Sequence, residues 1–406
     1  MPHGRRPAGG IRWAVPGVAA RRRPEGADED TGGGSMKVLV AGGGTAGHVF
    51  PALAVARRLA DHHGAEVRFA GTAAGQEARL VPAAGFELIE VRARPLLRRA
   101  SVGALRAPFV ALASVRRCRP LVRGCDVVLG MGGYVSAPPV IAAWREHTPI
   151  VLHEQNAIPG LANRLLSRVA AVTALSFEEA ARGLPRRART EVTGNPIRES
   201  IGAVPAGREG LAKEAYVELD LDPERRTVVI FGGSQGALHV DRAAVGACQL
   251  LRDRGDLQVL LLTGPAHHDS VSRGVPEGVA LHVRVLPFLD RMDLAYAVAD
   301  LVVSRSGATT VAEVTACGIP SVLIPYPYAT AGHQEANARA VQRAGGASLL
   351  LDEQLTAEAL AERIESLVDH EERLVSMRER ASAWARPDAA ERVADLVARA
   401  ASEGSR

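Results

Sequence analysis

Residues 302–313 read Val302-Val303-Ser304-Arg305-Ser306-Gly307-Ala308-Thr309-Thr310-Val311-Ala312-Glu313 and decide the fold, because a strand, a tight turn and a helix follow one another there. The apolar run 299–303 predicts a buried parallel strand, and residues 309–316 predict a helix. Such an arrangement directs free backbone N–H groups at one point, which attracts phosphate. Glu313, about one helical turn in, can accept hydrogen bonds from a sugar diol. Taken alone, the pattern favours an ordinary α/β crossover with a capped helix. The phosphate-binding interpretation gains support because two more turns of the same kind occur elsewhere in the chain.

Size and composition indicate a two-domain globular protein. A chain of 406 residues is too long for one typical core. An apolar content of 47% and a charged content of 23% are ordinary for a globular protein. No CxxC pair occurs, which indicates a reducing compartment and argues against a disulfide framework or a zinc site. The four cysteines are Cys118, Cys125, Cys248 and Cys317.

Residues 1–35 differ from the rest of the chain. A basic stretch is followed by an acidic one and then by glycines, with no apolar segment of the kind that a secretory signal needs. We expect a disordered extension, or a start upstream of the true first residue, Met36. The first predicted strand, 37–41, begins at once after it.

The first glycine loop follows that strand. Residues 42–48 read GGGTAGH and contain the pattern G-x-G-x-x-G at Gly42, Gly44 and Gly47. A dinucleotide site would also need an acidic residue at the end of the second strand. The second predicted strand, 66–70, ends without one, so a nicotinamide dehydrogenase is disfavoured.

A second glycine loop, residues 130–136, follows another predicted strand. Residues 127–144 carry no charge over nearly the length of a membrane span, but three glycines and two prolines argue against a spanning helix.

The next predicted strand, 149–152, ends in the polar run 153–156 (HEQN), at the place where open α/β sheets position ligand groups. The second half repeats the layout, with strand 226–231 entering a third glycine loop. We therefore infer two successive β/α halves whose ligand loops face one cleft.

Residues 92–123 are strongly basic. Nine arginines and no acidic residue alternate with apolar side chains, which suits the surface of an anionic membrane. Nucleic acid is a competing interpretation, but aromatic stacking residues are almost absent. The third interpretation is an ordinary helix with its arginines in solvent and its apolar side chains in the core. The arginines are at positions 92, 94, 98, 99, 106, 116, 117, 119 and 123.

Six motifs in order resemble one family, the bacterial cell-wall transferases that add N-acetylglucosamine to undecaprenyl-diphospho-N-acetylmuramoyl-pentapeptide (lipid I) and form lipid II. The resemblance covers about residues 36–400. It departs at Ala46, where the family has glycine, and in the less charged loop 326–333. We expect Ala46 to cost little if its φ is negative. The motifs are residues 43–48, 130–136, 153–156, 194–198, 232–236 and 305–308.

The resemblance implies the α/β GT-B fold, with two Rossmann-like, doubly wound domains facing a cleft. It implies an acceptor- and membrane-facing domain over residues 36–197, joined by the last helix at about 386–402, and a UDP-sugar domain over 198–385. It also implies no cofactor and no nucleic acid. The partners expected are UDP-N-acetylglucosamine, the undecaprenyl-linked muramyl-pentapeptide, the cytoplasmic face of the cell membrane as a peripheral site, and the cell-wall and division machinery.

The resemblance also assigns binding residues. Leu289 would meet uracil through its backbone, Glu313 the ribose, and Gln334 and Asn156 the sugar hydroxyls. The acceptor diphosphate would lie at Gly44, Gly132, Gly133 and Tyr134. The full set at UDP-N-acetylglucosamine is Thr45, Ala46, Gly47, Asn156, Arg198, Ser234, Leu289, Ala308, Thr309, Thr310, Val311, Ala312, Glu313 and Gln334.

An inverting transfer needs a base for the acceptor 4-hydroxyl and stabilisation of the departing diphosphate. His48 is our candidate base; equally, it could cap the following helix. Glu154 is the second candidate, unless it orients a neighbour. Helix N-termini and Arg198 would stabilise the leaving group, so we expect no metal. The DxD-like run 220–222 fits a turn better.

Two other functions stay open from sequence. A UDP-sugar 2-epimerase of related fold would convert the donor without any acceptor. A binding module without catalysis would keep its function when both His48 and Glu154 are replaced.

Overall fold

The computed structural model describes residues 35–91, 102–233 and 237–404, with backbone alone over 102–111. Ser35–Arg406 form one compact unit. The prediction for the N-terminal extension therefore lies outside the described residues, as do Ser234 and the arginines at 92, 94, 98 and 99.

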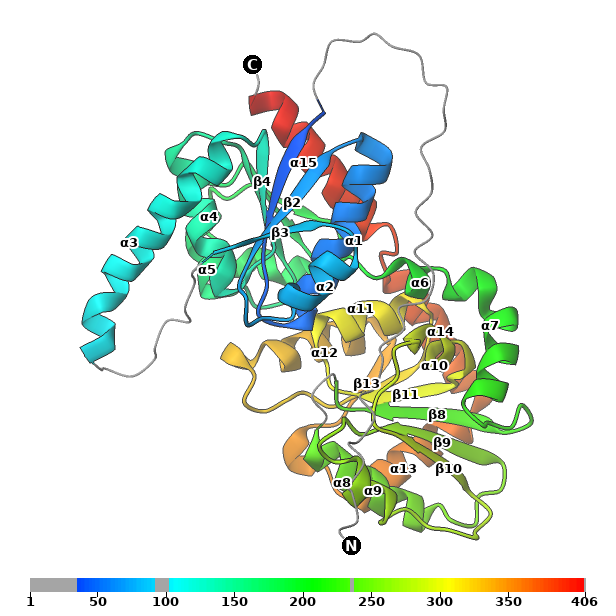
Figure 1. Cartoon of the computed structure of the whole chain (residues 1–406). Helices are drawn as coiled ribbons and strands as arrows, with labels where there is room; N and C mark the ends of the chain where they lie inside the picture. The colour runs from blue at the N-terminus through cyan, green and yellow to red at the C-terminus, as the bar shows by residue number, and fades with distance from the viewer. Residues whose placement is uncertain (1–34, 92–101, 234–236, 405–406) are drawn as a thin grey trace, which may run out of the picture. The chain divides into compact units, whose positions relative to one another are not determined.

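The first half of the chain builds a seven-stranded sheet, and every strand pairs in parallel with its neighbours (Figure 1). Apart from the exposed Lys37, the residues of the central strands β1, β4 and β5 are buried, and most of them are apolar, as expected when helices cover both faces. In spatial order the strands are β3 (Glu87–Glu90), β2 (Glu66–Gly71), β1 (Lys37–Ala41), β4 (Val127–Gly130), β5 (Ile150–Glu154), β6 (Val172–Leu175) and β7 (Thr190–Val192).

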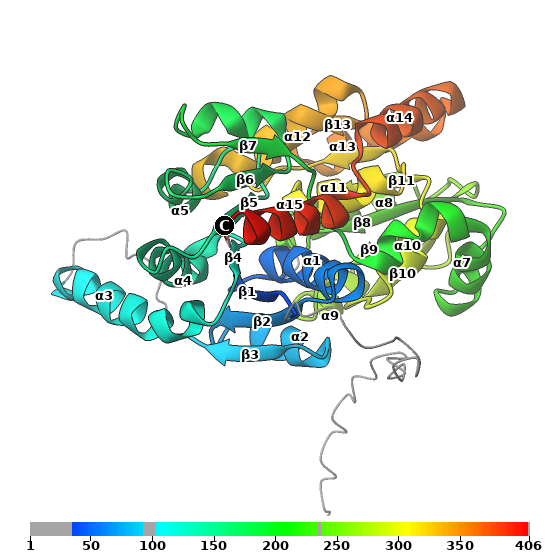
Figure 2. The ribbon, with the colours of Figure 1, turned by 90° about the horizontal axis from the view of Figure 1, so that it is seen from above.

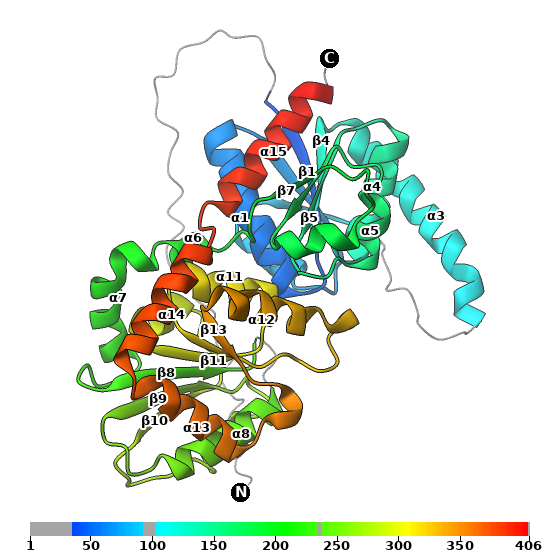
Figure 3. The same cartoon turned by 180° about the vertical axis from the view of Figure 1, so that it is seen from behind.

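Helices cover both faces of this first sheet. On one face, α1 (Ala46–His63) and the last helix, α15 (Ala389–Gly404), pack together over the strands, as Figures 2 and 3 show. On the other, α3 (Val102–Arg123), α4 (Gly133–Arg145) and α5 (Leu161–Leu166) share a second core. The remaining elements of this half are α2 (Glu77–Ala83) and the 3₁₀ turn η1 (Glu178–Gly183).

The second half builds a six-stranded parallel sheet. The opening stretch of the sequence forms its centre, because Val303 lies between Ile230 and Val322. In spatial order the strands are β10 (His282–Leu286), β9 (Leu257–Leu262), β8 (Arg226–Phe231), β11 (Leu301–Ser304), β12 (Ser321–Leu323) and β13 (Ala347–Leu349).

One face of this second sheet packs against α8 (Leu238–Leu250), α13 (Ala357–Val368) and α14 (Glu371–Trp384). The other packs against α6 (Glu199–Gly202), α7 (Val204–Glu218), α10 (Met292–Val298) and α11 (Ala308–Ala316). The shorter or peripheral elements are α9 (His268–Ser272), η2 (Thr330–Gly332), α12 (His333–Ala344) and η3 (Asp352–Gln354).

The strand order reverses at the same place in both sheets. The first strand of each half, β1 or β8, lies between the second strand and the fourth. Ligands of open α/β sheets bind outside the carboxyl ends of the strands at this reversal. In the first sheet both glycine loops follow the two strands concerned, β1 and β4; in the second, the third glycine loop follows β8 and residues 305–307 follow β11.

The last helix belongs to the core of the first half, although it follows the second half in sequence. Val393, Leu396 and Val397 of α15 are at most 4% exposed and lie in the same cluster as Val38 and Val40 of β1. Burying such a side chain stabilises a fold by about 1.5–3 kcal/mol. The expected domain boundaries at 197/198 and 385/386 stay predictions. Among the described residues, no helix combines the length and apolar content that crossing a membrane requires.

Candidate functional site

A buried carboxylate shapes the first glycine loop. Glu77, at the start of α2, accepts a hydrogen bond from the Gly44 N–H (2.8 Å) and two from Thr72, through its N–H (2.9 Å) and hydroxyl (2.7 Å). Burial alone raises the pKa of Glu77, but the hydrogen bonds from Thr72 and Gly44 outweigh it and hold the pKa below its usual value. The carboxylate is therefore ionised. Sequence reasoning missed Glu77.

His48 lies in the first turn of α1, between the two glycine loops. Its Nδ1 is 2.8 Å from the Thr45 hydroxyl, and a Cβ on Gly133 would lie 3.8 Å from its Nε2. Burial, together with His333, lowers the pKa of His48 to about 4, against a smaller opposing effect of Glu77. The imidazole is therefore neutral near pH 7 and can accept a proton.

The second glycine loop lies against the first. Gly132 and Gly133 have φ values of 81° and 74°, which favour glycine, and Gly44 has 87°. The Tyr134 ring would lie 3.5 Å from a Cβ on Gly44, so it covers the first loop. The structure thus brings together all four residues predicted at the acceptor diphosphate, whose role there stays a prediction.

Ala46 opens α1 and is not among the described non-glycine residues with positive φ. The departure from the family glycine therefore creates no backbone strain. The DxD-like run behaves as a turn, because Asp222 accepts a hydrogen bond from the Glu224 N–H at 2.9 Å.

Glu154 holds the loop that follows β5. The residue is 3% exposed, and its carboxylate accepts hydrogen bonds from the Asn156 N–H (3.0 Å), the Gly160 N–H (2.9 Å) and the Asn163 amide (2.9 Å). This geometry favours the orienting role that sequence left open for Glu154. Its role as a base stays a prediction.

Asn156 is held by Asn337, which comes from α12 in the second half. The Asn337 amide donates to the Asn156 side-chain oxygen (3.2 Å) and to the Ser306 carbonyl (3.2 Å), while its own oxygen accepts from the Ala157 N–H (2.8 Å). Asn337 is fully buried. Sequence reasoning did not place it in the site, although a polar side chain on the inward face of an otherwise alanine-rich helix segment was a usable signal.

Glu313 and Arg198 form an ion pair. The Arg198 Nη2 and Nε lie 2.9 Å and 3.1 Å from Glu313 Oε1, and the Tyr296 hydroxyl donates to Oε2 at 3.1 Å. Burial opposes the charge on Arg198, but Glu313 outweighs it and raises the arginine pKa above its usual value. The pair fixes the carboxylate and leaves further lone pairs for a ligand.

The N-termini of α1 and α11 meet. The Thr309 hydroxyl donates to the Gly47 carbonyl at 3.3 Å. In neither helix does the side chain of the N-cap residue, Thr45 or Gly307, cap a backbone N–H of the first turn. Helix N-termini present free N–H groups and positive potential, so two of them at one place suit an anion. Thr45, Ala46 and Gly47 thus lie beside the turn that carries Ala308, Thr309 and Thr310.

The remaining residues predicted to bind UDP-N-acetylglucosamine differ in burial and in their contacts. Val311 is a core residue, Leu289 packs against the core that the second sheet shares with α7 and α10, and Ala312 lines a cavity behind α11. The Gln334 side-chain oxygen accepts from the Tyr326 N–H at 2.9 Å, which anchors loop 326–333. Ser234 lies outside the described residues.

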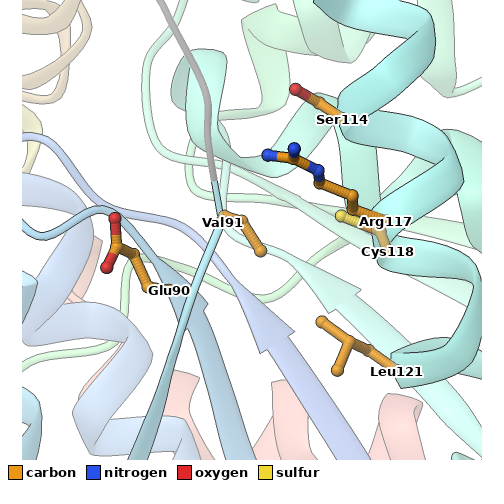
Figure 4. Close-up of a pocket in the computed structure, with 6 residues that line it drawn as sticks. All are labelled: Glu90, Val91, Ser114, Arg117, Cys118 and Leu121. Carbon is orange, nitrogen blue, oxygen red and sulfur yellow. The ribbon is translucent and has the colours of Figure 1, made fainter.

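Two cavities lie near these elements. One of about 290 Å³ separates α11 from the crossing to α15 and is lined by Asn195, Ala308, Ala312, Trp384 and Arg386, among others. The other, of about 210 Å³, lies between the end of β3 and α3, where Glu90 and Val91 stand across from Ser114, Arg117, Cys118 and Leu121 (Figure 4). Burial raises the pKa of Cys118 to about 11, so the thiol stays protonated. This second cavity contains no predicted site residue.

Comparisons with known proteins agree with this layout. Residues 38–175 match the glycosyltransferase family 28 N-terminal domain, and residues 227–393 match its C-terminal domain. A relative from Myxococcus xanthus is 41% identical over 365 residues, covering 89% of this chain and 92% of the relative. One from Halothermothrix orenii is 39% identical over 371 residues, covering 89% and 98%. Both are named UDP-N-acetylglucosamine–N-acetylmuramyl-(pentapeptide) pyrophosphoryl-undecaprenol N-acetylglucosamine transferase.

Solved structures show the same similarity. The crystal structure of Acinetobacter baumannii MurG has a TM-score of 0.72 at 29% identity and covers 90% of this chain and 99% of its own. A UDP-GlcNAc 2-epimerase from Neisseria meningitidis, bound to UDP-GlcNAc, has a TM-score of 0.63 at 14% identity, covering 90% and 100%, which shows a shared fold alone. The predicted GT-B fold is confirmed.

Proposed function

The chain belongs to glycosyltransferase family 28 and, within it, to the UDP-N-acetylglucosamine–N-acetylmuramyl-(pentapeptide) pyrophosphoryl-undecaprenol N-acetylglucosamine transferases, and from this premise we propose how its site works. The enzyme transfers N-acetylglucosamine from UDP-N-acetylglucosamine to lipid I and forms lipid II in peptidoglycan synthesis. The family predicted from sequence motifs is thereby confirmed.

The observation that carries our mechanism is the meeting of the α1 and α11 N-termini at the contact between Thr309 and Gly47. The donor diphosphate lies at this point, where N–H groups of both helices face it. The ion pair of Arg198 and Glu313 stands beside α11: Glu313 accepts from the ribose hydroxyls and Arg198 adds positive charge near the diphosphate. Developing negative charge on the departing UDP is stabilised there without requiring a cation.

His48 takes the proton. Its Nδ1 lies against Thr45, which leaves Nε2, on the side of Gly133, free to accept. The acceptor 4-oxygen attacks the anomeric carbon, the bond from that carbon to the UDP oxygen breaks with inversion, and the hydroxyl proton moves to Nε2. The bound diphosphates raise the low pKa of His48 through their negative charge, so the base strengthens when both substrates are present. Glu154 orients Asn156, which binds the sugar together with Gln334.

A direct assay tests the reaction. Purified protein receives labelled UDP-N-acetylglucosamine with and without lipid I, and UDP release and lipid II are measured. We expect release only with the acceptor. Turnover of the donor alone would instead indicate a 2-epimerase, and binding without any turnover would indicate a module without catalysis.

We also propose that the first half docks on the cytoplasmic face of the membrane. Trp144, Leu161 and Leu165, on the neighbouring helices α4 and α5, are 52%, 62% and 56% exposed. Arg145, Arg164 and Arg168, which lie near them in sequence, are exposed as well, which suits anionic headgroups. The basic helix α3 packs against α4, although two of its arginines, Arg119 and Arg123, pair with Glu146.

Vesicle binding tests this docking surface. The double variant Trp144→Ser/Leu165→Ser is expected to lose binding to phosphatidylglycerol vesicles while it keeps activity on a soluble acceptor analogue. Val217→Ser, at a position 83% exposed on α7, is the matched control and should bind like the parent. Equal binding of all three proteins would overturn the proposal. The association with cell-wall and division machinery stays a prediction.

A further inference from the structure

Glu77 belongs to neither the donor nor the acceptor residues discussed so far, yet it is the fully buried acid nearest to the first glycine loop. We propose that Glu77 is a positioning residue for the transfer: its carboxylate holds the Gly42–Gly44 turn in its working shape and supplies a fixed negative charge behind His48. This inference rests on the proposed function of His48 and deepens it.

Three glycines make room for this carboxylate. A Cβ on Gly43 would lie 2.3 Å from Glu77 Oε1, one on Gly75 would lie 2.0 Å from Oε2, and one on Gly71 would lie 2.6 Å from Cγ. These distances are far below van der Waals contact, so any side chain at these positions displaces the acid. The glycines therefore serve the acid as well as the turn.

The Glu77 carboxylate accepts a hydrogen bond from a backbone N–H of the first glycine loop. Gly44 has φ 87°, a left-handed conformation that turns its N–H inward, and that N–H ends on Glu77 Oε2. The hydrogen bond fixes which loop N–H groups remain for a ligand. The Gly44 N–H is occupied, so we assign diphosphate binding in this turn to the other N–H groups and to those of α1.

The charge also reaches His48. Glu77 from α2 raises the pKa of His48, while His333 from α12 lowers it, and His153 from β5 also interacts electrostatically with the His48 ring. The hydrogen bonds that Thr72 and Gly44 donate to the Glu77 carboxylate come from neutral groups. Removing the charge should make His48 a weaker base.

Glu77→Gln tests the charge and the hydrogen bonds together. The amide keeps one acceptor oxygen and replaces the other with an NH2 group, which can only donate, so at least one of the three buried donors loses its partner. We expect kcat with lipid I to fall about 10- to 100-fold, as when reacting groups are displaced slightly, and the acid limb of the pH profile to move to lower pH. The Kd of UDP should stay within about twofold, because Arg198, Glu313 and the N-terminus of α11 remain in place. Glu87→Gln, at the exposed start of β3, removes the same charge and should change none of these.

Gly75→Ala separates position from charge. It keeps the acid but pushes Oε2 away from Gly44, so we expect kcat to fall and the acid limb to shift less than in Glu77→Gln. Gly124→Ala is the control, since a Cβ there would have its nearest neighbour at 4.0 Å.

Amide hydrogen exchange at Gly44 provides a measurement that needs no turnover. Protection should be lost in Glu77→Gln and kept in Glu87→Gln. Unchanged protection, or an activity loss that is equal at every pH, would overturn the inference. A parent enzyme without acceptor-dependent UDP release would refute the proposed function instead, and the exchange measurement would still decide the role of Glu77.

Discussion

The two halves of the site are built on the same strand order but use different electrostatics. In the first half, His48 is neutral near pH 7 and the fixed charge of Glu77 is held by neutral donors beneath the loop. In the second half, Arg198 and Glu313 form a permanent ion pair with the Tyr296 hydroxyl. The first half can therefore exchange a proton during the reaction. The second half can bind the diphosphate of the donor, which is charged before and after the transfer.

Replacing the proton acceptor should impair catalysis without weakening UDP binding. We expect this substitution to have the largest effect on kcat of those proposed here. His48→Ala is expected to lower kcat about 10²- to 10⁴-fold, the usual contribution of a positioned base. The Kd of UDP, measured by calorimetry, should be nearly unchanged. A loss of UDP affinity as large as the loss of kcat would show that His48 serves the donor site and that the two halves are not separate in function.

Breaking the ion pair should affect the second half. Glu313→Ala removes the partner of Arg198, which is 26% exposed, so we expect a loss of about 2–3 kcal/mol in the free energy of unfolding, below the value for a fully buried pair. UDP affinity should fall about 10- to 100-fold through the lost ribose hydrogen bonds.

The control for this change is Glu209→Ala, which removes one partner of an exposed helical pair with Lys213 and should cost less than about 0.5 kcal/mol. Urea unfolding compares the two variants. If Glu313→Ala were no more destabilising than Glu209→Ala, the fixed pair could not be what distinguishes the second half.

The pH dependence should sharpen the contrast. Because the pKa of His48 is lowered to about 4, the neutral base persists well below the pH at which an ordinary histidine is protonated. The acid limb of kcat/KM should therefore lie near pH 4–5, and activity should be lost as the pH falls through it. UDP binding should stay flat over the same range. An acid limb near pH 6.5 would contradict the neutral environment assigned to His48.

The contact between the halves should matter least among the substitutions. Thr309→Val removes the hydroxyl that donates to the Gly47 carbonyl in an exposed place, so we expect a change in kcat of about fivefold or less. Thr310→Val, on the same helix turn, is the comparison. A loss of a hundredfold or more in Thr309→Val alone would mean that this contact controls the approach of the halves.

Chelation should have no effect at all. Helix N-termini and Arg198 stabilise the leaving group in our mechanism, so UDP release should be the same with and without EDTA. Activity that disappeared with EDTA and returned with Mg²⁺ or Mn²⁺ would refute it.

Much of the fold was predictable, because the buried central strands are apolar runs followed directly by small-residue turns. The predicted strand 299–303 and helix 309–316 correspond to β11 and α11 within two residues. The short edge strand β3 was missed, since its residues are only partly buried and half of them are charged.

Site residues that follow strand ends were predictable from the sequence. Site residues whose contacts join segments far apart in the sequence were not. His48 follows the glycine loop after β1, and Glu154 is the last residue of β5. Glu77 begins a helix and folds back beneath the loop, and Asn337 reaches its partners from the other half of the chain. The close spacing of Gly71 and Gly75 just before this acid was an available signal for Glu77.

The position of α15 has a consequence for how the protein is made. Its side chains complete the core beside β1, so a strand made early in synthesis waits for a helix made much later. The core between β1 and α15 cannot close until α15 has been made. Cutting the chain after α14 should therefore harm the half that was made first.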